Sequence, residues 1–257
     1  MTDELPLPHT STGSDPRPPL VFLHGFCTDR SAWQGVSEAL AGRRREIVFD
    51  LPGHGAALAW SEPVNAAIAA KAVLASLEAL GVPRCHLIGH SLGGATAVLI
   101  ALMQPERIAS LTLLAPGGFG YEVNDRLLTR YATATSTQAV QAAYEGMFGF
   151  SAVISSDLID SAVENRSRPG ALASYQAILP SLSNQGVQKQ IDRSALFALP
   201  MPIKVVWGTQ DRVLPTRQAH RLPGHVASHV FEDVGHLLPY EIPEAIAKLV
   251  LQNAAVE

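Results

Sequence analysis

Residues 87–94, "LIGHSLGG", place one serine between glycines directly after an apolar run. The stretch fits the pattern Gly-x-Ser-x-Gly, and the neighbouring sequence predicts a strand before the serine and a helix after it. In such a turn the serine takes a strained backbone conformation with positive φ, which displays its hydroxyl above the sheet. Gly89 and Gly93 lack the side chains that would collide with the adjoining strand and helix. The pattern therefore favours a nucleophilic Ser91 over a serine that only fills a tight turn.

Around this turn, short β-rich runs alternate with helical runs, which is typical of a mostly parallel sheet with crossover helices. We expect strands at residues 20–25, 46–55, 85–89, 108–116, 202–208 and 228–233. We expect helices at residues 31–40, 64–80, 92–103, 137–148, 171–179, 215–222 and 241–253. Only helical patterns occur between residues 117 and 199. The sequence thus predicts an α/β core formed by residues 1–116 and 200–257, with a helical insertion at residues 117–199.

The composition limits the classes of protein to consider. With 257 residues, 47% hydrophobic and 16% charged, the chain can bury one core of this size. Its net charge is −4 and its longest basic run is three arginines, so we expect no binding to nucleic acid. The expected partner is a small-molecule substrate, without a metal or cofactor. The sequence leaves the oligomeric state open.

The N-terminal 19 residues and the cysteines bear on the expected compartment. Acidic residues and prolines stand where a secretory signal needs a basic and then an apolar segment. Charged or amide residues interrupt every hydrophobic segment before it reaches the ~20 apolar residues of a membrane-spanning helix. Cys27 and Cys85 do not form a Cys-x-x-Cys pair, which fits a reducing compartment. We therefore expect a cytoplasmic protein without a membrane span.

A serine nucleophile requires a base and an acid that orients the base. Asp211 directly follows the expected strand at 202–208, and His236 follows the strand at 228–233. Both positions lie at carboxyl ends of parallel strands, where sheets of this type gather their ligands. We predict that Ser91, Asp211 and His236 form a catalytic triad.

Other side chains compete for these roles. Asp233 also ends a strand, but it precedes His236 by only three residues, so Asp211 is favoured as the acid. His24 and His54 lie in turns near the site, where bracing a loop is the favoured role. Cys27 lacks the display that the turn gives Ser91, so packing is favoured over a catalytic thiol.

Attack on a carbonyl creates an oxyanion, which backbone N–H groups can stabilise. We predict that Leu92, the first residue of the helix after Ser91, supplies one N–H group and Phe26 supplies the other. Substrate choice is expected to depend on the insertion, whose aromatic side chains either line an apolar pocket or form its core. The candidate pocket residues are His24, Phe119, Tyr121 and Phe148.

Five motifs give the chain its resemblance to a known family: "HGF" (24–26), "DLPGHG" (50–55), "GHSLGG" (89–94), "WGTQD" (207–211) and "VGH" (234–236). In order and spacing they resemble the α/β-hydrolase family. The resemblance implies that the insertion is a cap over the active site and that the triad falls on the residues derived above. Members usually open with an antiparallel hairpin. The short, proline-rich N-terminal segment here predicts that this hairpin is truncated or missing.

The resemblance also implies a range of reactions. Related dehalogenases and epoxide hydrolases carry an aspartate where this chain has Ser91. Esterases, enol-lactonases, carbon–carbon bond hydrolases, perhydrolases and acyltransferase modules associated with acetoin metabolism remain similar. Our main hypothesis is hydrolysis of a small carboxylic ester or lactone through an acyl-serine intermediate. The alternatives are acyl transfer or carbon–carbon cleavage by the same triad, and a binding protein without catalytic activity.

Overall fold

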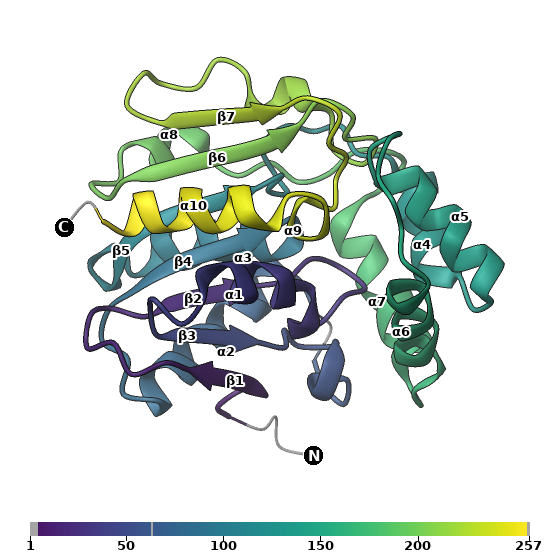
Figure 1. Cartoon of the computed structure of the whole chain (residues 1–257), viewed down its shortest axis with the longest axis horizontal. Coiled ribbons are helices and arrows are strands. Elements are labelled where there is room, and N and C mark those ends of the chain that lie inside the picture. Colours follow the sequence, from purple (N-terminus) through teal and green to yellow (C-terminus); the bar gives the residue numbers. More distant parts are fainter. Residues whose placement is uncertain (1–4, 63, 256–257) are drawn as a thin grey trace.

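The computed structural model describes residues 5–62 and 64–255 of the chain. Within these residues, seven strands form one sheet in the order β1-β3-β2-β4-β5-β6-β7 (Figure 1). Their bounds are β1 His9–Thr12, β2 Leu20–Leu23, β3 Glu46–Phe49, β4 Cys85–His90, β5 Ile108–Leu114, β6 Ile203–Gly208 and β7 Ala227–Phe231. The mostly parallel sheet with crossover helices that the sequence predicts is confirmed.

Strand composition follows position in the sheet. Strands β2, β3, β4 and β5 are buried along their whole length, as expected for parallel strands covered on both faces. The edge strand β7 alternates between exposed and half-buried residues, and the polar β1 is mostly exposed at the other edge. All neighbouring pairs are parallel except β1 and β3. The N-terminal hairpin, which the sequence predicts to be truncated or missing, is represented by one antiparallel strand.

Helices cover both faces of the sheet. The helices α1 (Gln34–Leu40) and α10 (Pro243–Ala254) pack together on one face, and α2 (Ala66–Ala79) and α3 (Leu92–Met103) pack on the other (Figure 1). The short helix α9 (Leu238–Glu241) precedes α10. Single 3-10 turns occupy η1 Arg30–Trp33, η2 Gly55–Ala57, η3 Pro105–Arg107 and η4 Thr216–Ala219.

The segment between β5 and β6 is helical. It contains α4 Asp125–Thr133, α5 Thr137–Met147, α6 Ser156–Ser167, α7 Ala171–Leu182 and α8 Arg193–Phe197. The helices α4 to α7 pack on one another in a group beside the sheet, whereas α8 contacts α3 (Figure 1). The division into a core and a cap at residues 117–199 stays a prediction.

The strand order creates a natural binding position. The strand β2 pairs with β3 on one side and β4 on the other, so the chain changes direction across the sheet at β2. In open parallel sheets, ligands bind at the carboxyl ends of strands where this reversal occurs. The loop after β2 begins at His24, and the turn after β4 holds Ser91.

One predicted helix differs from the structure. The expected helix at residues 215–222 was wrong, because the chain forms only the 3-10 turn η4 there. Arg221 has φ of +55°, and Gln218 uses its side chain to donate to the carbonyl oxygen of Glu122, so the segment is held in an irregular path. The expected closing helix at residues 241–253 corresponds to α10, and α9 is a separate short helix before it, because Pro243 has no N–H group to continue α9.

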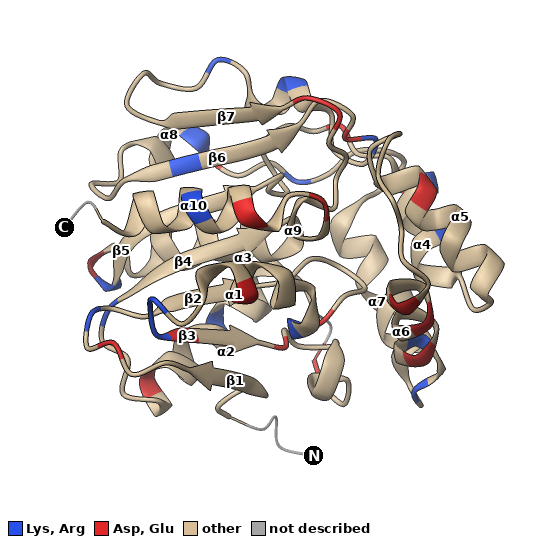
Figure 2. Cartoon of the chain, in the orientation of Figure 1, with Lys and Arg blue, Asp and Glu red and all other residues tan. Residues whose placement is uncertain are grey.

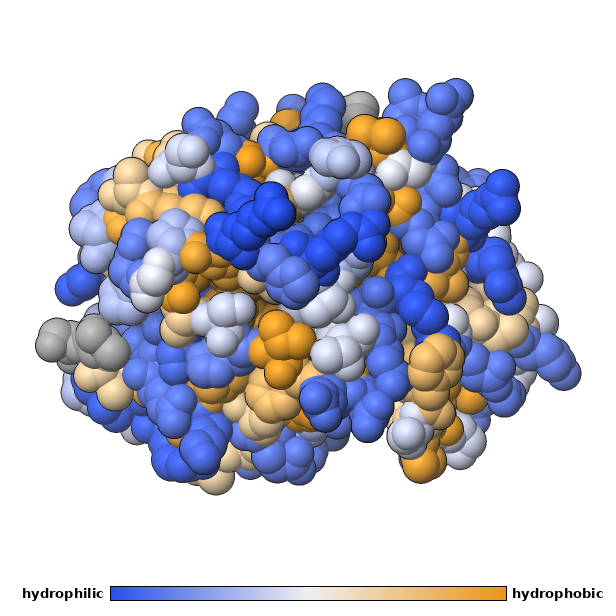
Figure 3. Space-filling view, turned by 90° about the horizontal axis from the view of Figure 1, so that it is seen from above, coloured by the Kyte–Doolittle hydropathy of each residue, from blue (hydrophilic) through white to orange (hydrophobic). Residues whose placement is uncertain are grey.

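Charge and hydrophobicity are dispersed over the surface. Acidic and basic residues are scattered along the ribbon, and α6 carries Asp157, Asp160 and Glu164 (Figure 2). The face in Figure 3 is mostly hydrophilic, with small, separate hydrophobic areas. Among the described residues, no helix has the length and apolar character needed to cross a bilayer.

Candidate active site

Ser91 occupies a strained turn between β4 and α3. Its backbone has φ of +52° and ψ of −111°, a conformation that is rare for a residue with a side chain. The Ser91 N–H group donates to the carbonyl oxygen of Leu114 at 3.0 Å. The Ser91 carbonyl oxygen accepts from the N–H groups of Ala95 and Gly117, each at 3.0 Å. These three bonds hold the strained residue at the end of the sheet.

The glycines around Ser91 allow a close approach of backbone segments. A Cβ atom on Gly89 would lie 2.3 Å from the carbonyl oxygen of Gly93. A Cβ atom on Gly93 would lie 2.1 Å from the carbonyl oxygen of Leu23, at the end of β2. Side chains at either position would therefore force apart β2, β4 and the start of α3.

Replacing Gly93 by alanine is expected to lower the free energy of unfolding by about 3 kcal/mol, since the new methyl group meets rigid backbone. The melting temperature should fall by about 6–12 °C. Thermal unfolding followed by circular dichroism measures both changes. Gly224 is the matched control, because a Cβ atom there meets nothing within 4 Å, and Gly224→Ala should change stability by less than about 0.5 kcal/mol. Equal melting temperatures for the two variants would contradict this account of the turn.

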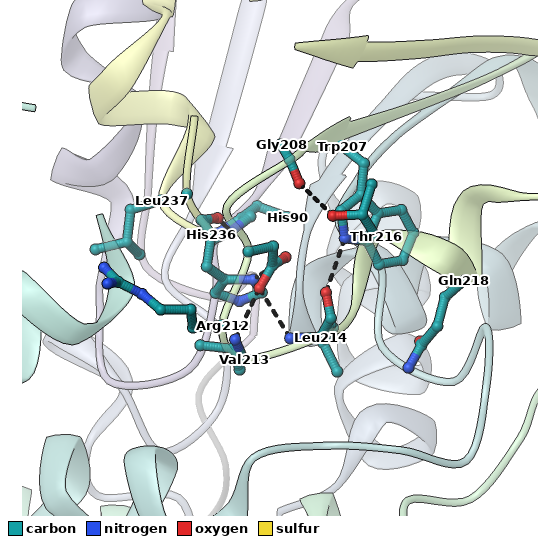
Figure 4. Close-up of polar contacts among 12 residues, drawn as sticks. His90, Trp207, Gly208, Arg212, Val213, Leu214, Thr216, Gln218, His236 and Leu237 are labelled. Carbon is teal, nitrogen blue, oxygen red and sulfur yellow. Dashed lines mark hydrogen bonds and ion pairs between the residues drawn. The ribbon is translucent and has the colours of Figure 1, made fainter. Parts of the chain in front are cut away.

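The structure brings Asp211 and His236 together. Nδ1 of His236 donates to Oδ2 of Asp211 at 2.8 Å, and the two side chains are 2% and 0% exposed. The other carboxylate oxygen of Asp211 accepts from the N–H groups of Val213 and Leu214, both at 2.8 Å (Figure 4). Because an ionised carboxylate only accepts hydrogen bonds, it fixes the proton of His236 on Nδ1. In the neutral imidazole, Nε2 then carries no proton and can accept one.

The loop that carries Asp211 is fixed to the end of β6. Nε1 of Trp207 donates to the carbonyl oxygen of Leu214 at 3.0 Å, and Oγ1 of Thr216 donates to the carbonyl oxygen of Gly208 at 2.6 Å (Figure 4). The carboxylate of Asp211 closes the same loop on itself. Side chains before and after Asp211 therefore hold its loop in place.

His90 joins the nucleophile turn to the histidine loop. Its Nε2 donates to the carbonyl oxygen of His236 at 2.8 Å, and the two ring centroids lie 5.0 Å apart. Burial, reinforced by the neighbouring His236 imidazole, holds the pKa of His90 well below its usual value, so the ring stays neutral. Ser91 is the next residue in the chain. This link was not predicted from the sequence, because no local pattern encodes it.

His24 orients the predicted oxyanion loop. Its Nε2 accepts from the N–H group of Leu51 at 2.9 Å, so Nδ1 carries the proton and donates to the carbonyl oxygen of Gly25 at 2.8 Å. Oγ1 of Thr28 donates to the same oxygen at 2.8 Å. In a trans peptide the next N–H group, that of Phe26, points away from this carbonyl. Burial lowers the pKa of His24, which keeps the ring neutral, so that Nε2 can accept from Leu51.

The other predicted oxyanion donor is the N–H group of Leu92. Leu92 is the first residue of α3, and the first four N–H groups of a helix lack an intrahelical acceptor. Gly25 approaches this turn closely, since a Cβ atom on it would lie 3.5 Å from Cβ of Ser91. The loop after β2 and the start of α3 thus flank Ser91 from two sides.

The candidate pocket residues lie in different surroundings. Phe119 is buried against Phe197 and Trp207, and Phe148 is buried against Tyr144 and Tyr240. Tyr121 is 59% exposed, which places it on the surface and not in a closed pocket. His24 acts as the loop brace described above. Their assignment to a substrate pocket stays a prediction, and the exposure of Tyr121 argues against that residue.

The competing candidates have other partners or surroundings than the Asp211–His236 pair. Asp233 is exposed, and its Oδ1 accepts from Nε2 of Gln210 at 2.8 Å. Cys27 is buried, and burial raises the pKa of its thiol far above the ordinary value, which disfavours a thiolate. His54 is a buried loop residue whose Nδ1 bonds the carbonyl oxygen of Pro52, and burial lowers its pKa to about 3.

Two further features bear on ligand binding. Over residues 5–62 and 64–255, no three histidine, cysteine or acidic side chains gather in a way that could hold a metal ion. A cleft of about 630 Å³ lies between β1, β3, η1 and α6, and its lining includes Asp29 and Asn165. Ser91, Asp211 and His236 are not part of that lining, so the cleft is separate from the candidate site.

The fold and the Ser91 turn define a class of protein, and comparison with known proteins agrees. The profile of the alpha/beta hydrolase family matches residues 20–249. The chain belongs to the α/β-hydrolase family.

Individual relatives perform different reactions. The dihydrolipoyllysine-residue acetyltransferase component of the acetoin cleaving system of Pseudomonas putida is 29% identical over 239 residues, which cover 93% of this chain and 64% of that protein. The counterpart from Cupriavidus necator is matched over 59% of its length, so this chain spans about three fifths of these two relatives. Monoacylglycerol lipase ABHD6 of Rattus norvegicus is 26% identical over 93% of this chain and 76% of its own.

Solved structures show the same fold. A meta-cleavage product hydrolase from Pseudomonas fluorescens superposes with a TM-score of 0.82 at 20% identity, covering 95% of this chain and 92% of the other. The carboxylesterase CesB from Bacillus subtilis superposes with a TM-score of 0.78 at 20% identity, covering 95% of this chain and 86% of the other.

Proposed function

We propose that the protein is a serine hydrolase that cleaves a small carboxylic ester or lactone through an acyl-serine intermediate. The observation that carries this proposal is the strained Ser91 turn beside a buried His236–Asp211 pair. In the proposed reaction, Nε2 of His236 takes the proton of Ser91 Oγ as that oxygen attacks the ester carbonyl. The tetrahedral intermediate then expels the alcohol, which receives the proton from His236. Water, activated by the same Nε2, hydrolyses the acyl-serine.

The negative charge of the tetrahedral intermediate would lie between the N–H groups of Phe26 and Leu92. Each such donor, aligned before reaction, contributes about 3–4 kcal/mol to stabilising the transition state. The bracing of Gly25 by His24 and Thr28 supports this role for Phe26, because it fixes the peptide plane in advance. Residues 117–199 form the proposed cap, which would set the substrate's size.

A panel of 4-nitrophenyl esters of increasing acyl length, together with simple lactones, tests the proposed reaction. With 4-nitrophenyl esters we expect an initial burst of one 4-nitrophenolate per protein molecule, since the good leaving group makes deacylation the slow step. Stopped-flow absorbance measures the burst, and mass spectrometry of the quenched sample identifies the acylated residue. Turnover without acylation of Ser91 would contradict an acyl-serine mechanism.

The relatives also support two other outcomes of the same panel. Because two similar proteins are acetyltransferase components, competing alcohols or thiols are added to see whether the acyl group is transferred to them. Because a similar fold belongs to a meta-cleavage product hydrolase, a vinylogous diketone is included to detect carbon–carbon cleavage. Products in which the acceptor carries the acyl group, or a cleaved diketone with no ester turnover, would replace ester hydrolysis as the assigned reaction.

A small-molecule substrate and a cytoplasmic location belong to this proposal. Both cysteines are free and buried, which suits a reducing compartment. A binding protein without catalytic activity is the remaining alternative. A binding protein has no need of a strained serine beside a buried histidine and carboxylate.

A further inference from the structure

The backbone around His236 is held from several sides. The His236 N–H group donates to the carbonyl oxygen of Met147 at 2.7 Å, and its carbonyl oxygen accepts from Nε2 of His90 at 2.8 Å. Met147 is the last residue of α5, in the segment that we assign to the cap. The proposed general base is thus bonded directly to that segment.

Glu241 binds the residues on either side of His236. Its Oε2 accepts from the N–H group of Gly235 at 2.9 Å, and its Oε1 accepts from that of Leu237 at 3.1 Å. The same Oε2 accepts from the N–H group of Gly149, just beyond α5, at 2.7 Å. One carboxylate therefore satisfies three backbone donors from two separate segments. Burial raises the pKa of Glu241, and the three hydrogen bonds oppose this shift by favouring the charged form.

The two segments that Glu241 joins are in direct backbone contact. A Cβ atom on Gly235 would lie 2.3 Å from the carbonyl oxygen of Met147, and one on Gly149 would lie 2.1 Å from that of Asp233. Arg212, next to the proposed acid, donates to the carbonyl oxygens of Glu145 and Phe148. Residues 145–149, the end of α5 and the two residues after it, thus support both the loop of Asp211 and the loop of His236.

We propose that Glu241 is a positioning residue for His236: its carboxylate fixes the backbone on both sides of His236 and bonds it to residues 145–149 at the end of α5. Glu241 does not contact the proposed reacting atoms. It acts by keeping the imidazole in line between Asp211 and Ser91. This inference rests on the proposed function, because it assigns Glu241 a part in orienting the proposed base.

The isosteric variant Glu241→Gln tests the inference. An amide has one acceptor oxygen and two donors, so it must present an N–H group to at least one backbone N–H group. We expect kcat for a 4-nitrophenyl ester to fall about 10²-fold with KM unchanged, since a misplaced base affects chemistry and not substrate binding. A second variant, Glu241→Leu, removes all three bonds and should reduce kcat further. Each kcat is expressed per folded molecule, with the folded fraction taken from thermal unfolding followed by fluorescence.

A measurement without substrate separates this inference from the proposed function. In the wild type, the proton shared by His236 Nδ1 and Asp211 should give a low-field proton NMR signal, and Glu241→Gln should shift or broaden it. This readout remains informative if no ester is hydrolysed by the wild type. Glu244→Gln is the matched control, because it removes the same charge from an exposed residue of the adjoining α10 and should leave kcat within twofold.

Three results would overturn the inference. The first is a folded Glu241→Gln protein with wild-type kcat, or with an unchanged proton signal if there is no turnover. The second is a rise in KM alone, which would place Glu241 in substrate binding. The third is a loss of activity equal to the loss of folded protein, which would make Glu241 a stabilising residue only.

Discussion

Ser91→Ala is expected to lower kcat for ester hydrolysis by about 10⁴-fold or more. The alanine removes the only oxygen that the proposed mechanism uses to form the acyl intermediate, so the remaining rate would come from binding and the oxyanion donors. The fold should be unaffected, because Ser91 is held by its backbone N–H and carbonyl groups, which alanine retains. Steady-state kinetics with 4-nitrophenyl acetate measures the loss, and circular dichroism verifies the fold.

Labelling with a fluorophosphonate gives a second measure of the same residue. The wild type should take up one label per molecule on Ser91, and Ser91→Ala should take up none. Ser11→Ala is the control, since Ser11 is an exposed residue of the edge strand β1 and its loss should change neither rate nor labelling. Equal ester turnover by wild type and Ser91→Ala would refute the hydrolase proposal. An unlabelled wild type would favour a binding protein.

The fold was predictable from the sequence where local patterns decide it. The apolar runs that became β2, β4 and β5 are buried on both faces, so they read as continuous hydrophobic stretches. The need for glycine at positions 89 and 93 was also predictable, because the Ser91 turn leaves no space for a Cβ atom at either position. Residues 215–222 were mispredicted because tertiary contacts, including the side chain of Gln218 with Glu122, outweigh their helical pattern. The strand β1 was not predicted, since its polar residues suit an exposed edge and resemble a loop.

The candidate site was predictable only in part. Asp211 and His236 follow the carboxyl ends of parallel strands, which meet at one edge of the sheet. The structure places Oδ2 of Asp211 2.8 Å from Nδ1 of His236. The contacts of His236 with Met147, His90 and Glu241 were not predictable, because each joins segments that no local pattern relates. A glutamate five residues after the histidine was visible in the sequence, but only the fold shows that its carboxylate turns back to the histidine loop. The catalytic roles stay predictions until the variants are measured.

Asp211→Asn is expected to lower kcat by about 10⁴-fold while leaving the fold intact. The N–H groups of Val213 and Leu214 need an acceptor, so the asparagine oxygen should remain facing them. The amide group then faces Nδ1 of His236 and donates to it. His236 must accept at Nδ1 and carry its proton on Nε2, where it can no longer take the proton of Ser91. The loss therefore comes from the wrong tautomer and not from lost packing.

Asp233→Asn is the matched control for this variant and also tests the rival acid. Asp233 is exposed, its backbone φ of +59° is one that asparagine tolerates, and its carboxylate bonds Gln210 instead of His236. We expect Asp233→Asn to keep kcat within about threefold of wild type, because a single exposed hydrogen bond contributes about 1 kcal/mol or less. Steady-state kinetics on both variants separates the two carboxylates. If Asp233→Asn lost as much activity as Asp211→Asn, or if Asp211→Asn stayed within tenfold of wild type, Asp211 would not be the acid that orients His236.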